Sequence, residues 1–89
     1  MPSLLIEKID DTHFQVSVQS DAPTQHMVTV PIAYAQKLTG GSVNTEHLVK
    51  KSFEFLLTRE PNTSILRSFE LSVIGHYFPE YEREIKRML

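Results

Sequence analysis

The chain has 89 residues, 40% of them hydrophobic and 22% charged, a balance typical of a folded domain and unlike that of a disordered chain. This length predicts a single domain over residues 1–89 with one hydrophobic core. The formal net charge of −2 gives no overall attraction to nucleic acid, and the lack of cysteine excludes thiolate chemistry and favours a cytoplasmic protein.

Apolar and polar residues alternate along the first third of the chain, as they do in half-buried strands. Phe14, Val16 and Val18 all point one way from such a strand, and the residues between them are polar. Polar turns separate this strand from its two neighbours. We therefore expect a three-stranded antiparallel β-meander with strands at about 4–9, 12–18 and 25–30.

After Pro31 the apolar residues recur with the period of a helix. Gly40-Gly41 ends a first helix, Asn44 or Thr45 caps a second that stops before Pro61, and Pro79 opens the last one after an extended Phe78. The expected helices span about 32–39, 45–59, 64–77 and 79–88, the third of them broken or kinked. The predicted fold class is α+β, with three to four helices packed on one face of the meander.

The sequence contains no recognisable set of catalytic or metal-binding residues. Its four histidines lie far apart, and Pro79 breaks the helix that would align His76 with Glu80 for metal binding. Gly40-Gly41 lacks the lysine and the spacing of a phosphate-binding loop, and no nucleophile motif is present. We expect no catalytic residue, no metal and no cofactor. We also expect no signal peptide and no segment that spans a membrane.

Residues 25–58 have the element order of a ribbon-helix-helix DNA-binding domain, a strand followed by two helices. In that class a strand from each subunit of a dimer enters the major groove. Gln25 and Thr29 would then contact bases, and Lys50 and Lys51 would contact phosphates. The expected strand itself carries no lysine or arginine, so nucleic acid is not the favoured partner.

The helix expected at 45–59 is apolar over a wide arc. Phe55 and Leu57 lie at opposite edges of this arc, about 160° apart around the helix axis. A helix that rests on one sheet buries a narrower face, so something further must cover one edge. The chain's own C-terminal region is one candidate, and a second copy or another protein is the other, with Phe55 and Leu57 as contacts.

The region from Leu57 to Glu82 contains the segments Arg59-Glu60-Pro61, Ser64-Ile65-Leu66 and Tyr77-Phe78-Pro79-Glu80-Tyr81. With Phe69, Leu71 and Ile74 between them, these segments resemble a family of short uncharacterised bacterial proteins of about this length. The resemblance covers roughly the C-terminal third and implies no ligand or chemistry.

With no site chemistry evident, the sequence favours a non-catalytic function. We interpret the chain as a small regulatory or accessory protein that binds another macromolecule, either an unknown protein or a second copy of itself. A ribbon-helix-helix-like DNA-binding dimer is the first alternative. An enzyme acting on an unknown small molecule is the second, because active sites built from distant residues are invisible in one sequence.

Overall fold

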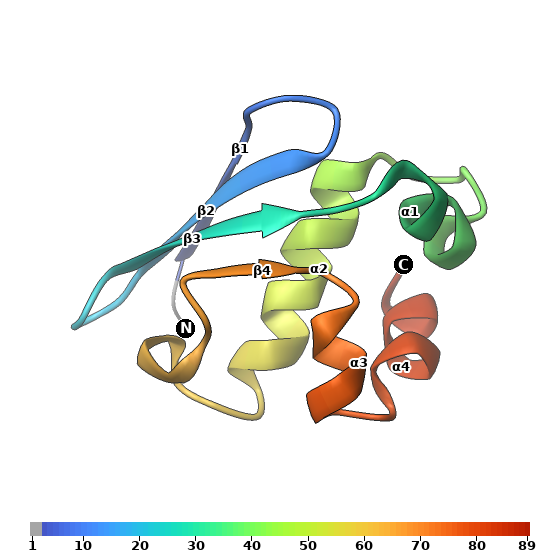
Figure 1. Cartoon of the computed structure of the whole chain (residues 1–89). Coiled ribbons are helices and arrows are strands. Elements are labelled where there is room, and N and C mark those ends of the chain that lie inside the picture. The colour runs from blue at the N-terminus through green and yellow to red at the C-terminus, as the bar shows by residue number, and fades with distance from the viewer. Residues whose placement is uncertain (1–2) are drawn as a thin grey trace.

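The computed structural model describes residues 3–89, which form a four-stranded sheet with helices on one face (Figure 1). The elements along the chain are β1 (Ser3–Lys8), β2 (His13–Gln19), β3 (Thr24–Thr29), α1 (Ile32–Thr39), α2 (Thr45–Leu57), the 3₁₀ turn η1 (Asn62–Ser64), β4 (Ser68–Glu70), α3 (Val73–Tyr77) and α4 (Tyr81–Met88). The α+β class and the antiparallel meander of the first three strands are therefore confirmed.

Strand β2 shows why the meander forms where the sequence predicts it. Phe14, Val16 and Val18 are fully buried beneath the helices, whereas His13 and Gln15 point to the other face and stay partly exposed. A one-residue shift in register would exchange these two sets and expose the apolar side chains. Burial of one face therefore holds the register of the sheet.

The first two helices begin and end at the predicted signals. Pro31 precedes α1, and Gly40 ends it in a left-handed conformation with φ of 63° while its N–H donates to the carbonyl of Gln36. The Asn44 side chain caps α2 by accepting a 2.8 Å hydrogen bond from the backbone N–H of His47. Helix α2 is two residues shorter than the predicted 45–59, since it ends at Leu57.

The predicted helix at 64–77 is wrong. This segment instead holds the end of η1, then β4, and only then the short helix α3. Strand β4 runs parallel to β3 and adds a fourth strand to the sheet, with Phe69 beside Val28. In the meander only one edge of β3 is bonded, to β2, and the other edge offers hydrogen-bonding partners to β4. A local sequence pattern does not reveal this pairing, because the two strands are distant in the chain.

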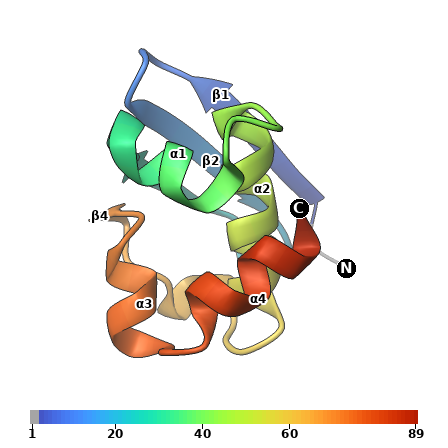
Figure 2. The same cartoon turned by 90° about the vertical axis from the view of Figure 1, so that its right-hand side faces the viewer.

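The last helix was predicted over 79–88 and is found as α4. Phe78 is extended as expected, with φ of −129° and ψ of 90°, but the helix starts at Tyr81, two residues after Pro79. Helix α4 contacts α1, α2 and α3 (Figure 2). It therefore joins the other helices into one layer.

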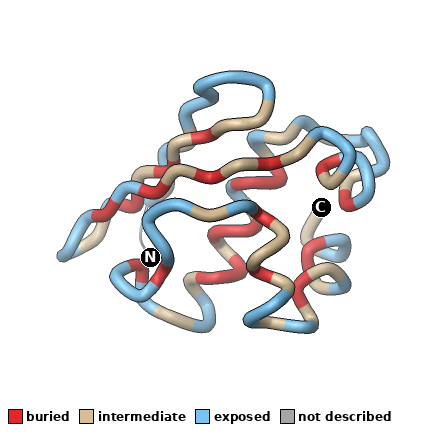
Figure 3. The backbone as a smooth tube through the Cα atoms, in the orientation of Figure 1, coloured by how far each residue is buried: buried red, intermediate tan, exposed pale blue. Residues whose placement is uncertain are grey.

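The core lies between the sheet and this helical layer, and the residues that form it are buried positions along α2 and alternate positions along β2 and β3 (Figure 3). Helix α2 supplies Leu48, Val49, Phe53 and Leu56 to it. The opposite face of the sheet has no covering element within residues 3–89. None of the helices formed by these residues combines the length and apolar composition that crossing a bilayer requires.

Candidate functional site

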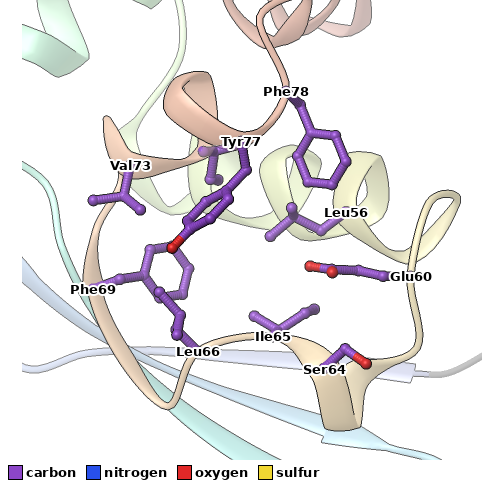
Figure 4. Close-up of a pocket in the computed structure, with 10 residues that line it drawn as sticks. Leu56, Glu60, Ser64, Ile65, Leu66, Phe69, Val73, Tyr77 and Phe78 are labelled. Atoms are coloured by element: carbon purple, nitrogen blue, oxygen red, sulfur yellow. The ribbon is translucent and has the colours of Figure 1, made fainter.

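An apolar groove opens between the C-terminal end of α2 and the segment that carries η1, β4 and α3 (Figure 4). It encloses about 320 Å³, near the lower end of the range for small-ligand pockets. Its polar lining consists of the Glu60 carboxylate, the Ser64 hydroxyl and the Tyr77 phenol. The apolar lining residues are Leu56, Ile65, Leu66, Phe69, Val73, Ile74 and Phe78.

Two large side chains on the rim of this groove are exposed to solvent. Leu66 is 47% exposed and Tyr77 is 67% exposed, whereas Ile65 and Ile74 are buried in the floor. Figure 4 shows the Tyr77 side chain reaching from α3 toward Phe69 and Leu66. The groove therefore presents a wide apolar surface to solvent.

A buried polar network holds the Leu66 side of the groove in place. The His26 ring on β3 contacts the Leu66 carbonyl through Nδ1 at 2.7 Å and the Thr24 hydroxyl through Nε2 at 2.8 Å. Asn62 of η1 donates from Nδ2 to the same Thr24 hydroxyl at 2.9 Å and to the Ala22 carbonyl at 2.8 Å. The β2–β3 hairpin thus fixes both η1 and the residue that forms the rim.

The network also determines the protonation of His26. The Leu66 carbonyl can only accept, so Nδ1 carries the proton and donates, while Nε2 accepts from the Thr24 hydroxyl. Burial lowers the pKa of His26, and the nearby positive charge of Arg67 lowers it further against the opposing effect of the Leu66 carbonyl. The ring is therefore neutral at pH 7.

The α2 side of the groove is braced by an aromatic and ionic cluster. The Arg59 guanidinium lies 3.6 Å from the ring centroid of Phe55, and its Nε donates to Glu80 Oε2 at 3.2 Å. Phe55 makes edge-to-face contacts with Phe78 and Tyr81, with centroids 5.9 and 5.3 Å apart. These contacts join the end of α2 to the start of α4 and give several residues of the distinctive C-terminal stretch a structural role.

Glu60 differs from the charged residues next to it. Its neighbour Arg59 pairs with Glu80, but no ion pair formed within residues 3–89 includes Glu60. The half-buried Glu60 side chain instead lines the apolar groove. It supplies a negative charge at a surface to which the described part of the chain contributes no lysine or arginine.

The structure separates the two residues predicted as a partner interface. Phe55 is only 2% exposed because Phe78 and Tyr81 cover it, so in this structure the C-terminal region occupies the edge of α2 that Phe55 marks. Phe55 is thus not available as a surface contact of the folded chain. Leu57 is half-buried against the core.

The four residues named for DNA binding do not share a surface. Gln25 and Thr29 alternate with the buried residues of β3 and point to the uncovered face of the sheet. Lys50 and Lys51 lie on α2, which packs on the opposite face, and Lys51 pairs with Glu54 at 3.1 Å. Strand β3 is bonded to β2 and β4 on its two edges, so neither edge remains to form a ribbon with a second copy.

The residues considered for metal binding are not assembled into a site. Glu80 is held by Arg59, and His76 lies on the exposed side of α3. In the part of the chain that the structure describes, no three histidine, aspartate or glutamate side chains gather closely enough to hold a metal ion.

The groove itself was not predicted. The sequence predicts Leu66 and Phe69 within a helix at 64–77 and assigns no binding role to Glu60 or Tyr77. One signal was present: a stretch rich in large apolar residues and interrupted by prolines holds more apolar area than short helices can bury. The position of the groove depends on β4, which the sequence pattern did not reveal.

Comparison with known proteins adds no relative: no family model matches the sequence, and neither the curated proteins nor the solved structures yield a match. The resemblance of the C-terminal stretch to short bacterial proteins stays a prediction. The functional argument therefore rests on the groove.

Proposed function

We propose that this chain is a small non-catalytic regulatory or accessory protein that acts by binding another macromolecule through the groove between α2, η1, β4 and α3. The observation that carries the proposal is the open apolar groove with Leu66 and Tyr77 exposed on its rim. Contiguous apolar surface with an exposed aromatic residue is typical of interaction sites, because its removal from water favours association.

The chemistry of the lining also supports binding. The lining places a single carboxylate among mostly apolar side chains, and such an arrangement suits the recognition of a bound group. Among residues 3–89, Glu60 is the one charged residue in the groove lining. Such a group gives orientation and specificity to a partner that apolar contacts hold.

Substitutions on the rim test this proposal. We expect Leu66→Asp and Tyr77→Ala to abolish partner binding with little change in stability, since both side chains are exposed. Ile32→Asp is the matched control, because Ile32 is 61% exposed at the start of α1, away from the groove, where an acidic residue suits the helix dipole.

The wild-type chain and the three variants would each be immobilised and used to capture proteins from an extract of the native host. A captured protein, once purified, should bind the wild type and Ile32→Asp with equal affinity in calorimetry and should bind neither groove variant. Equal retention by all four chains, or no captured protein at all, would count against the proposal.

A further inference from the structure

Strand β4 leaves one edge of its backbone open beside the groove. On the other edge, the Arg67 carbonyl accepts from the N–H of Met27 at 2.8 Å, and the N–H of Leu71 donates to the Thr29 carbonyl at 2.9 Å. Backbone groups alternate in direction along a strand, so the N–H and C=O groups of Ser68 and Glu70 point away from β3. Since β4 is the last strand of the sheet, these groups face the open edge.

The open edge and the groove belong to one surface. Phe69, which lies between Ser68 and Glu70, is itself a lining residue of the groove. Figure 4 shows the Phe69 and Val73 side chains at one side of the groove and Glu60 at the other. An extended chain laid along β4 would therefore place alternate side chains into the groove.

The charge of the lining selects among possible occupants. Glu60 repels phosphate groups, so the groove does not suit a nucleic acid, and its carboxylate favours a cationic side chain. A volume of about 320 Å³ holds one or two large side chains and no folded element. A short peptide segment with a basic side chain carries no phosphate, pairs with the Glu60 carboxylate and fits the volume of the groove.

We propose, on the basis of the function assigned above, that the groove binds an extended peptide segment of a partner protein. The segment adds to the free edge of β4, places a large apolar side chain against Leu66 and Tyr77, and pairs a lysine or arginine with Glu60. Side chains two residues apart in a strand point the same way, so the recognised pattern is apolar, any residue, basic.

Short synthetic peptides test this pattern directly. One fluorescein-labelled peptide carries a central leucine with a lysine two residues away, and matched peptides carry glutamine or glutamate in place of the lysine, or serine in place of the leucine. We expect the lysine peptide to bind about 3- to 10-fold more tightly than the glutamate peptide in anisotropy titrations. We expect the serine peptide not to bind.

Variants of the carboxylate identify its role. Glu60→Gln should remove the preference for lysine but keep the requirement for leucine, and Glu60→Lys should reverse the preference in favour of glutamate. Glu7→Lys is the control, because Glu7 is exposed on β1 at the far edge of the sheet, and it should behave as the wild type. In ¹⁵N spectra the amides of Ser68 and Glu70 should shift on binding.

The outcomes separate this inference from the proposed function. If the rim variants lose a captured partner but no peptide binds, or lysine and glutamate peptides bind equally, the peptide inference is wrong and the groove still binds a macromolecule. If a peptide binds but shifts amides elsewhere and leaves those of Ser68 and Glu70 unchanged, the proposed addition of a strand to β4 is wrong. If neither peptides nor any captured protein depend on the groove, both proposals fail.

Discussion

The imidazole of His26 connects the sheet to the groove through two hydrogen bonds, and the one from the Thr24 hydroxyl needs the neutral ring. Nδ1 donates to Leu66 and Nε2 accepts from Thr24, whose hydroxyl also accepts from Asn62. A second proton on the ring would leave the Thr24 hydroxyl without its acceptor and place a positive charge near Arg67. At the scale of one residue, therefore, acid should weaken the buried network that joins His26 to Thr24 and Asn62.

The pH dependence of stability should show this effect. The folded state lowers the pKa of His26 below its usual value of about 6.5, so the unfolded chain binds the proton more readily. The contribution of His26 is present above pH 6.5 and is lost as the pH falls toward the folded-state pKa. We expect the free energy of unfolding to drop by at most about 1.4 kcal/mol per pH unit in this window.

Urea denaturation between pH 7.5 and 5 measures this slope, in a range that lies above the usual pKa values of the carboxyl groups. His26→Gln should flatten the slope, and His76→Gln, which changes an exposed histidine, should keep that of the wild type. An unchanged slope in His26→Gln would show that the buried ring does not control the acid response.

At the scale of elements, one buried hydrogen bond joins α2 to α4. The Ser52 hydroxyl donates to the Leu48 carbonyl at 2.7 Å, so the Tyr81 hydroxyl must be the donor in its 2.6 Å contact with Ser52. Both side chains are fully buried, and burial raises the pKa of Tyr81. The pair therefore lets a polar aromatic residue occupy the core between two helices.

A double-mutant cycle on this pair tests the coupling between the helices. Ser52→Ala leaves the buried Tyr81 hydroxyl without an acceptor and should lower the free energy of unfolding by about 1–3 kcal/mol. Tyr81→Phe removes the donor and should lower it by about 0.5–1.5 kcal/mol. The double variant removes both groups, so it should lose about 1 kcal/mol less than the sum of the single changes. Additive losses in chemical denaturation would mean that the hydrogen bond contributes nothing.

The elements differ in how far the sequence predicted them. The meander, α1 and α2 follow from local period and caps such as Asn44 and Gly40, since each signal lies within the element that it defines. Strand β4 has three residues, too few for a period to appear, and its partner β3 is distant in the sequence. The groove was missed for the same reason, because Glu60 and Tyr77 line one groove only through the placement of the segment that contains β4.

At the scale of the whole molecule, Phe55 lies where α2, α4 and the residue before Pro79 meet. The chain's own C-terminal region, one of the two candidates named from the sequence, covers this edge of α2. Phe78 and Tyr81 pack against the Phe55 ring, and Arg59 lies over it. Leu57 at the other edge is only half-buried. The two residues should therefore respond differently to substitution.

Phe55→Ala should cost about 3–5 kcal/mol, much of the stability of a domain this small, because it empties a buried site. Leu57→Asp should leave the chain folded and should not change its mass in light scattering, since the proposed partner surface is the groove. Denaturation curves and gel filtration measure both effects. A wild-type dimer that dissociates in Leu57→Asp would instead make Leu57 a contact between two copies.

The contact between His26 and Leu66 spans 40 residues of sequence, and it has a consequence for how the chain folds. The meander closes through short turns, whereas β4 must find β3 across α1, α2 and their connections, and closing so long a loop costs entropy before the new contacts form. We therefore expect β4 to dock late in the folding reaction. The meander would then be ordered before the groove forms, so the chain would be able to bind a partner only when folding is complete.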